Sequence, residues 1–190
     1  LDPHSWEVNR EVARMLFRNG RIPESIPYFE KAGSLMETDW HNPLMLTTCY
    51  EATGDKEALR RVAKLTFDRT EKAVASDPTN GTALAGGAYS LAAFGELERA
   101  RDWTRRALLL DPDNLNMRYN LACTLIRQLG DADEAIDTLR PFFERINSRS
   151  LLRHMGVDPD LDPLRQDSRF KEMFAAAKKR LGMTEAEADA

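Results

Sequence analysis

The chain has 190 residues, of which 42% are apolar and 31% charged, so it is long and apolar enough to bury a sizeable core. Its net charge of −4 and isoelectric point near 5.5 argue against a nucleic-acid-binding module, which normally carries a basic surface. No apolar run approaches the roughly 20 residues that cross a bilayer, and the opening LDPHSWEVNR lacks a signal-peptide pattern. We therefore expect no membrane contact.

The two cysteines, Cys49 and Cys123, stand alone within helical patterns. A disulfide framework or a zinc site requires clustered cysteines, so we expect both to be small buried or half-buried side chains. Their isolation fits a reducing compartment, and we expect a cytoplasmic protein.

A repeat of 34 residues organises the chain. A small residue and a larger apolar one recur at spacings of 34, 41 and 34 residues. These positions are Ala13, Thr47, Ala88 and Ala122, and Leu16, Tyr50, Leu91 and Leu125. A fixed period of this length is typical of stacked helical hairpins.

The first three residues, Leu1-Asp2-Pro3, match Leu110-Asp111-Pro112 at the end of a later repeat. We therefore expect the chain to begin at the end of an earlier hairpin and to be a fragment of a longer protein. The first hairpin is expected over residues 6–39, with its turn at Gly20 and with Pro27 inside its second helix.

The second hairpin, expected over residues 40–80, is seven residues longer than the period. No Gly or Pro lies between Lys56 and Ala75, so we expect one long second helix. Seven residues make nearly two helical turns, so the inserted length keeps the apolar stripe on one face to within about 20°.

The third hairpin, residues 81–114, has the most regular pattern. Gly87, Ala88 and Ala100 are small enough for close helix packing, and Gly95 suits the left-handed conformation that ends a helix. The fourth hairpin is expected over residues 115–146, with a turn at Gly130 that comes one residue late.

The order of helix A, tight turn, helix B and Asp-Pro in each hairpin resembles the tetratricopeptide repeat (TPR) family. This resemblance implies an all-α fold, a right-handed α-α superhelix of about four TPR-like hairpins (residues 1–146) with C-terminal capping helices. It also implies a concave face, lined by the first helix of each hairpin, that binds other polypeptides.

The period stops after residue 146, and residues 147–182 are expected to form capping helices. Ser148–His154 predicts a short helix, and Asp158–Pro163 a link rich in turns. Its aspartates, Asp158, Asp160 and Asp162, are expected to cap helix ends rather than to bind calcium, because the Gly and bidentate Glu of a calcium loop are missing.

A last helix of roughly residues 168–181 carries an apolar face that would cover the end of the array. That face comprises Phe170, Met173, Phe174, Ala177 and Leu181. Residues 183–190 form an acidic tail that we expect to be loose. The stretch Leu161–Phe170 is similar to the C-terminal TPR region of bacterial multidomain regulators, such as proteins linked to class III nucleotide cyclases.

The sequence contains no catalytic constellation. The histidines His4, His41 and His154 are far apart, and there is no nucleophile elbow, phosphate-binding loop or dinucleotide fingerprint. We therefore expect neither an enzyme nor a bound cofactor or metal.

The period identifies the exposed columns of the first helices, which should line the groove. Tyr89 and Tyr119 are the expected anchors, because aromatic side chains contribute large binding energies. The expected peptide-binding residues are Glu7, Arg10, Arg14, His41, Leu44, Thr48, Glu51, Thr82, Tyr89, Asn116, Tyr119 and Cys123. A flanking column of Phe17, Glu51, Ala92 and Ile126 is also expected to be exposed.

Arg10, Arg14 and Arg18 form a basic stripe at i, i+4 and i+8. It is either a site for an acidic peptide or a solvated face neutralised by neighbouring glutamates. The tryptophans Trp6 and Trp40 are 34 residues apart and are expected to pack between hairpins, whereas the direction of Trp103 stays open.

These patterns predict a protein-interaction or regulatory module that binds a peptide, or a neighbouring domain of the same polypeptide, in its concave groove. The alternative is a structural module that self-associates, as a homodimer, through its N-terminal end. The two hypotheses share the fold and differ in the surface they use.

Overall fold

The computed structural model describes residues 4–183, so the predictions for Leu1-Asp2-Pro3 and for residues 184–190 lie outside the described residues. The fold is all-α, and within the described range the only elements are helices. Four antiparallel hairpins come first: α1 (Trp6–Arg18) with α2 (Ile22–Leu35), α3 (His41–Thr53) with α4 (Lys56–Ser76), α5 (Gly81–Ala93) with α6 (Leu97–Leu110), and α7 (Leu115–Arg127) with α8 (Ala132–Arg145). Three further helices follow: α9 (Arg149–Val157), the 3-10 helix η1 (Pro159–Leu164) and α10 (Ser168–Arg180).

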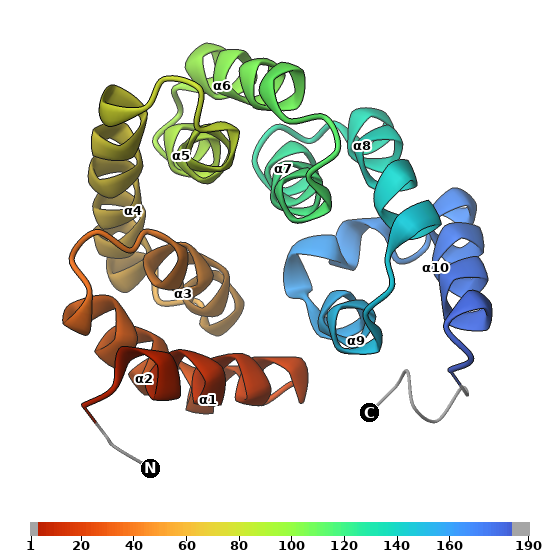
Figure 1. Ribbon diagram of the computed structural model, residues 1–190, viewed down its shortest axis with the longest axis horizontal. Helices are drawn as coiled ribbons and strands as arrows, with labels where there is room; N and C mark the ends of the chain where they lie inside the picture. Colours follow the sequence, from red (N-terminus) through yellow and green to blue (C-terminus); the bar gives the residue numbers. More distant parts are fainter. Residues whose placement is uncertain (1–3, 184–190) are drawn as a thin grey trace.

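The hairpins stack into a right-handed superhelix that is seen as an open arc in Figure 1. The helices α3, α5 and α7 lie on the inner side of the arc and α4, α6 and α8 on the outer side. From the second hairpin on, each first helix packs against its own partner and against the preceding hairpin, as α5 does against α6 and α4. The predicted fold class is confirmed.

The predicted turn glycines end the first helix of each hairpin. Gly20, Gly54, Gly95 and Gly130 all have φ between 67° and 81°, a left-handed backbone conformation that favours glycine. Aspartate side chains then cap two of the helices that follow, α4 and α8. Asp55 accepts a hydrogen bond from the Ala58 N–H at 3.0 Å, and Asp131 accepts one from the Glu134 N–H at 3.1 Å.

Close helix packing explains the pair Gly86-Gly87, as the sequence predicts. A Cβ atom at Gly86 would lie 2.6 Å from the Trp40 ring, and one at Gly87 would lie 2.3 Å from the Trp103 ring. The two indoles are 6% and 8% exposed, so Trp40 packs between hairpins as expected and Trp103 turns inward onto α5.

Trp6 is the exception, and its predicted core position is wrong. It is half-buried at the concave side, and the guanidinium of Arg10 lies 4.5 Å from the centre of its ring. The first hairpin has no preceding hairpin within the described residues to bury this indole.

The helix α4 runs unbroken for 21 residues, as expected from the absence of Gly and Pro. The Arg69 side chain of α4 forms hydrogen bonds to the end of α2 and to the connection between α2 and α3. The Nη1 atom donates to the carbonyl oxygens of Gly33 at 3.1 Å, Met36 at 3.2 Å and Asp39 at 2.5 Å. The guanidinium thus satisfies carbonyls that have left the helical ladder.

Replacement of Arg69 by Met keeps the apolar stem and removes these donors. We expect a loss of about 2 kcal/mol in the free energy of unfolding, because hydrogen bonds from charged donors contribute about 1.5–3 kcal/mol. Urea unfolding followed by circular dichroism measures it. Lys72→Met, on the exposed side of the same helix, is the control, and equal losses in both variants would contradict the role of Arg69.

The last helix, α10, covers the outer end of the array as predicted. Phe170 and Ala177 are buried, and Met173, Phe174 and Leu181 pack against the same core cluster as the side chains of α8. The apolar face that the sequence shows on this helix is therefore the face it buries.

Between α8 and α10, the short helix predicted from Ser148 is present as α9, whereas the predicted turn-rich link is a buried 3-10 helix, η1. The helices α9 and η1, here called the return segment (residues 149–164), fold back inside the arc. Within it η1 packs on α7 and α3, and α9 packs on α1 (Figure 1). Leu152, Met155, Leu161 and Leu164 are at most 1% exposed, so the return segment belongs to the core.

Candidate functional site

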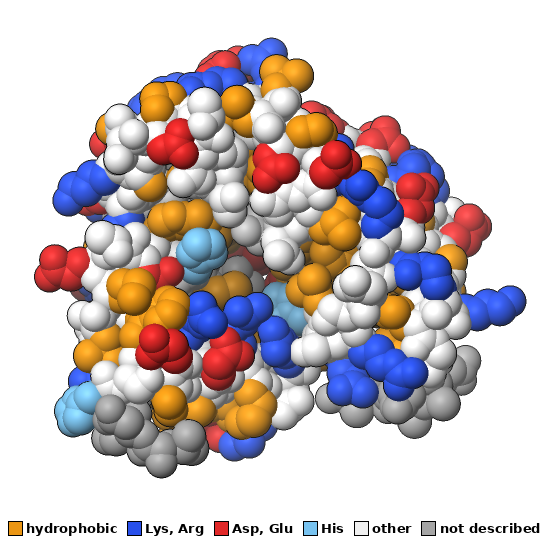
Figure 2. All heavy atoms as spheres, in the orientation of Figure 1, with side chains coloured by type: hydrophobic (Ala, Val, Ile, Leu, Met, Phe, Trp, Pro, Cys, Tyr) orange, Lys and Arg blue, Asp and Glu red, His pale blue; other side chains and the backbone are white. Residues whose placement is uncertain are grey.

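The concave side contains a cavity of about 550 Å³, here called the concave cavity. Its walls come from α1, the start of α3, the first half of α7, and α9. Seven of the predicted groove residues line it: Arg10, Arg14, His41, Leu44, Thr82, Asn116 and Tyr119. Figure 2 shows a hollow at the centre of this face, with basic side chains gathered along its α1 side.

The basic wall is formed by Arg10 and Arg14. Arg10 lies over the Trp6 ring, and its Nη2 atom is 3.0 Å from Glu11. The ion pair of Arg14 is weaker, because its Nη1 atom lies 3.9 Å from the same Glu11 carboxylate. Burial, followed by the neighbouring charge of Arg18, lowers the pKa of Arg14. Arg14 is therefore a partly desolvated guanidinium with spare hydrogen-bonding capacity.

Among the described residues, Asp39 is the one acidic residue that lines the cavity. Its oxygens accept from the N–H groups of His41 and Asn42, each at 3.1 Å, and from the Asn42 side chain at 2.6 Å. These bonds hold the pKa of Asp39 below its usual value although burial opposes them. Because the Asp39 oxygens are occupied, the cavity presents an excess of positive charge and donors.

The deeper part of the predicted groove is covered by the return segment. The Thr48 hydroxyl donates to Asp160 at 2.8 Å, and the Tyr119 hydroxyl donates to Asp158. Thr48, Tyr89, Tyr119 and Cys123 are between 3% and 7% exposed. The expectation that these four are exposed is wrong, because η1 occupies the surface that they would have presented.

A salt bridge beside η1 joins the second hairpin to the fourth. Arg127 of α7 donates to Glu51 of α3 at 2.6 Å, and the Tyr89 hydroxyl donates to the same carboxylate at 2.7 Å. Glu51 is therefore engaged within the protein. The sequence places it in the groove but does not predict its partners.

Asp158 and Asp160 form a buried pair of acids, 3% and 4% exposed. One oxygen of each and the Cys123 Sγ lie within 4.8 Å of one another. Burial raises the pKa of Asp160 to about 7, and burial with the charge of Asp160 raises the pKa of Asp158 well above its ordinary value. Their oxygens accept from Tyr119, Thr48 and the Asp160 N–H, so we assign a hydrogen-bonded acid pair rather than metal ligands.

His154 of α9 lies between this acid pair and α1. Its ring stacks on Phe17 with centres 4.8 Å apart, and its Nε2 is 3.9 Å from Asp158. Burial, followed by the charges of Arg18 and Arg14, lowers the pKa of His154 to about 3. The imidazole is therefore neutral at pH 7, and its approach to Asp158 is not an ion pair.

The predicted groove residue Glu7 lies outside the cavity. It is exposed in the first turn of α1, where it accepts a hydrogen bond from Ser5 at 2.9 Å. In the flanking column Phe17 is fully buried beneath His154 and Ala92 is 6% exposed, so the prediction that this column is exposed is wrong for these two residues. Leu151 and His154 line the cavity, yet no repeat pattern marks them, because they follow the last repeat.

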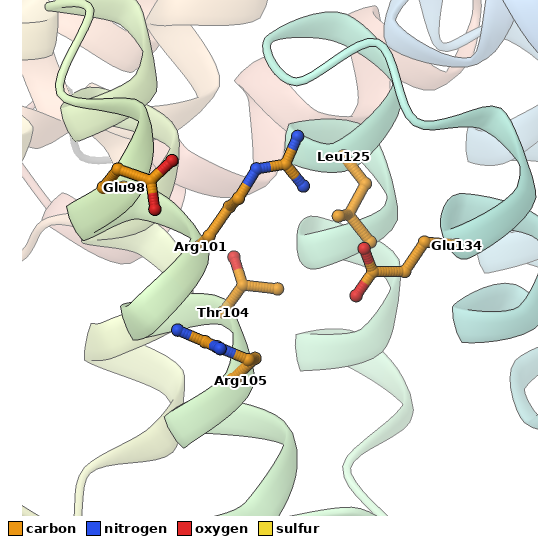
Figure 3. A pocket seen from close by; sticks show the side chains of 6 residues that line it. All are labelled: Glu98, Arg101, Thr104, Arg105, Leu125 and Glu134. Atoms are coloured by element: carbon orange, nitrogen blue, oxygen red, sulfur yellow. The ribbon is translucent and has the colours of Figure 1, made fainter.

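A second, smaller pocket of about 210 Å³ lies between α6, α7 and α8 (Figure 3). Arg101 and Arg105 line it together with Glu98 and Glu134, so its charges balance. None of the predicted groove residues lies there. The concave cavity, which is larger and has an excess of positive charge, is the candidate functional site.

Among residues 4–183, no helix combines the length and the apolar character needed to span a bilayer. No protein-family model matches the sequence, and no curated protein is similar enough to match it. A solved structure that is similar to this chain is that of a mutant of MamA, with 20% sequence identity and a TM-score of 0.39. The alignment covers 93% of this chain and 96% of that chain.

Proposed function

We propose that this protein is a non-catalytic interaction module that binds an extended, carboxylate-bearing peptide segment in its concave cavity. The observation that carries this proposal is the weakly paired guanidinium of Arg14, which faces a cavity of about 550 Å³. Binding sites for small ligands and peptide side chains have volumes of about 300–1,000 Å³.

The chemistry of the walls favours an acceptor-rich ligand. Arginine recognises carboxylates through charge-assisted, often bidentate hydrogen bonds. Asn116 and Asn120 add amide groups, and Trp6 has a buried Nε1–H without a partner among the described residues. Aromatic rings supply apolar contact area at a small entropic cost. The segment could belong to a separate protein or to a neighbouring domain of the same polypeptide.

Arg14→Glu tests this function. The probe is an array of hexapeptides that vary in the number and position of Asp and Glu, followed by fluorescence anisotropy on the tightest binders. We expect the variant to bind acidic hexapeptides at least tenfold more weakly, because it exchanges an attractive charge for a repulsive one. The loss should diminish at high salt, where the charges are screened.

Arg105→Glu is the matched control, because it makes the same charge change on an exposed residue of α6, away from the concave cavity. It should bind like the unmodified protein. Equal affinities for all three proteins, with helicity preserved, would rule out the concave cavity as the peptide site. Tyr89→Ala is unsuitable as a binding probe because Tyr89 is buried beneath the return segment.

A further inference from the structure

The return segment occupies the concave face as a bound peptide would. It enters the arc from the end of α8, and there η1 packs on α7 and α3 while α9 packs on α1 (Figure 1). Its polar contacts reach residues far away in sequence, since Thr48 and Asp160 are separated by 112 positions. What it covers, here called the floor, comprises four of the predicted groove residues, Thr48, Glu51, Tyr89 and Cys123, together with Arg127, the partner of Glu51.

Two carboxyl groups hold η1 on the floor, but there is little positive charge to balance them. Arg127 is the nearest cation, with its Nε atom 4.0 Å from Asp160, and it is bonded to Glu51 at 2.6 Å. Arg165 donates to the Asp158 carbonyl at 3.0 Å rather than to its carboxylate. The other ionisable groups around the pair are Cys49 and Glu51 of α3, Tyr89 of α5, Tyr119 and Cys123 of α7, His154 of α9, Asp162 of η1, and Arg14 and Arg18 of α1 beyond His154.

Two carboxylates this close in a buried site cannot both ionise without a large cost, so the docked segment holds at least one proton that the free segment would release. We propose that the return segment is a proton-linked cover of the concave face, which docks with its acid pair protonated and opens when the pair ionises. Opening exposes the floor and enlarges the concave cavity. The expected effect of opening on peptide binding rests on the proposed function, whereas the pH-dependent docking of the return segment does not.

The direction of the pH dependence follows from three groups. The acids have raised pKa values when docked, so they favour docking below about pH 4. The contribution of Asp160 is lost as the pH rises through about 7, and the raised pKa of Asp158 acts in the same direction. His154 acts oppositely, because its docked pKa of about 3 lies below the ordinary value of 6.5. Between about pH 4 and 6.5 His154 offsets one carboxyl group, and above pH 6.5 it is neutral in both states. Above pH 6.5 the offset from His154 is gone, so docking should weaken with rising pH until Asp160 is ionised in the docked state, near pH 7.

Hydrogen–deuterium exchange of the whole chain at pH 6.5 and pH 8.0 measures the opening directly. Exchange rates are corrected for the intrinsic effect of pH, and the long helix α4 serves as the internal reference. The protection of residues 149–164 should fall about threefold or more relative to α4 between these pH values. Equal relative protection at both values would overturn the proposal, and this result needs no variant.

Asp160→Asn and Asp162→Asn form a matched pair of variants in the same short helix. Asp160 is buried in the acid pair, whereas the Asp162 side chain is 61% exposed. In Asp160→Asn the fall in relative protection between the two pH values should be smaller than in the unmodified protein, because the group that ionises near pH 7 is gone and its charge no longer raises the pKa of Asp158. Asp162→Asn should keep the full dependence on pH. If both variants lose it, the acid pair is not its source.

The peptide array separates this inference from the proposed function. If the cover opens, acidic hexapeptides should bind more tightly at pH 8.0 than at pH 6.5, because only the open fraction offers the enlarged site. If hydrogen–deuterium exchange of the return segment depends on pH but no peptide binds at either pH, the proton-linked cover is supported and the proposed function is wrong. Peptide binding that is equal at both pH values, with unchanged exchange, would defeat the cover and sustain the function.

Discussion

Replacement of Phe17 by alanine should lower the free energy of unfolding by about 3–5 kcal/mol, the usual cost of truncating a buried phenylalanine. Phe17 is fully buried and makes an edge contact with Phe29, with ring centres 6.5 Å apart, and a stacked contact with His154 at 4.8 Å. The deletion leaves a cavity between α1, α2 and the return segment. It therefore weakens the first hairpin and the contact that closes the arc.

Met15→Ala is the control for this prediction. Met15 lies two residues away on the same helix and is 51% exposed, so its truncation should change the free energy of unfolding by about 0.5 kcal/mol or less. Urea unfolding monitored by helicity gives both values. A loss below about 1 kcal/mol in Phe17→Ala would show that α9 does not close on α1 in solution.

Gly87→Ala should destabilise the protein by about 1–3 kcal/mol, because the added methyl group has no space. Its Cβ would lie 2.3 Å from the Trp103 ring and 2.8 Å from the Thr70 Oγ1. Both neighbours are held in the packing between α4, α5 and α6, so they cannot move without disturbing two hairpins. The gain in helix propensity, up to about 1 kcal/mol, does not offset this clash.

Gly33→Ala is the control for Gly87→Ala, because it replaces a buried helical glycine at a site where the added methyl group makes no clash. Gly33 is also buried in a helix, but the nearest atom to its added Cβ, the Cδ of Pro43, would be 3.6 Å away, an ordinary contact. This variant should be as stable as the unmodified protein or more stable by up to about 1 kcal/mol. If both alanine variants lose equal stability, close packing is not what requires Gly87.

The hairpins and their ends are predictable from the sequence because their causes are local. Gly54 and Gly95 end helices through their own backbone conformation, and Asp55 caps α4 from the position directly before it. The unbroken α4 follows from the absence of a helix-breaking residue. The need for a small residue at Gly87 is also predictable, because small residues recur in the sequence where two helices of a hairpin pack closely.

The candidate site is only partly predictable. Arg10, Arg14 and Asn116 line the concave cavity because the period places them on the inner face, and that face remains open there. Tyr89 and Cys123 have the same periodic position but are buried, because a non-repeating segment lies over them. A repeat pattern describes only the repeating residues, so it cannot predict a contact that is made by the return segment, which lies outside the repeat.

The sequence alone determined an all-α array of stacked hairpins, the length of α4 and the apolar face of α10, because these depend on neighbouring residues and on a fixed spacing. Only the tertiary structure decided that the return segment covers the floor, that Asp158 and Asp160 become a buried acid pair, and that Phe17 lies beneath His154. These contacts depend on the curvature of the whole array, which brings α1 to α9 and α3 to η1 across more than a hundred residues. The Asp-Pro-Asp stretch that the sequence predicts as a turn-rich link is thus buried, because the curvature of the array brings its two ends together.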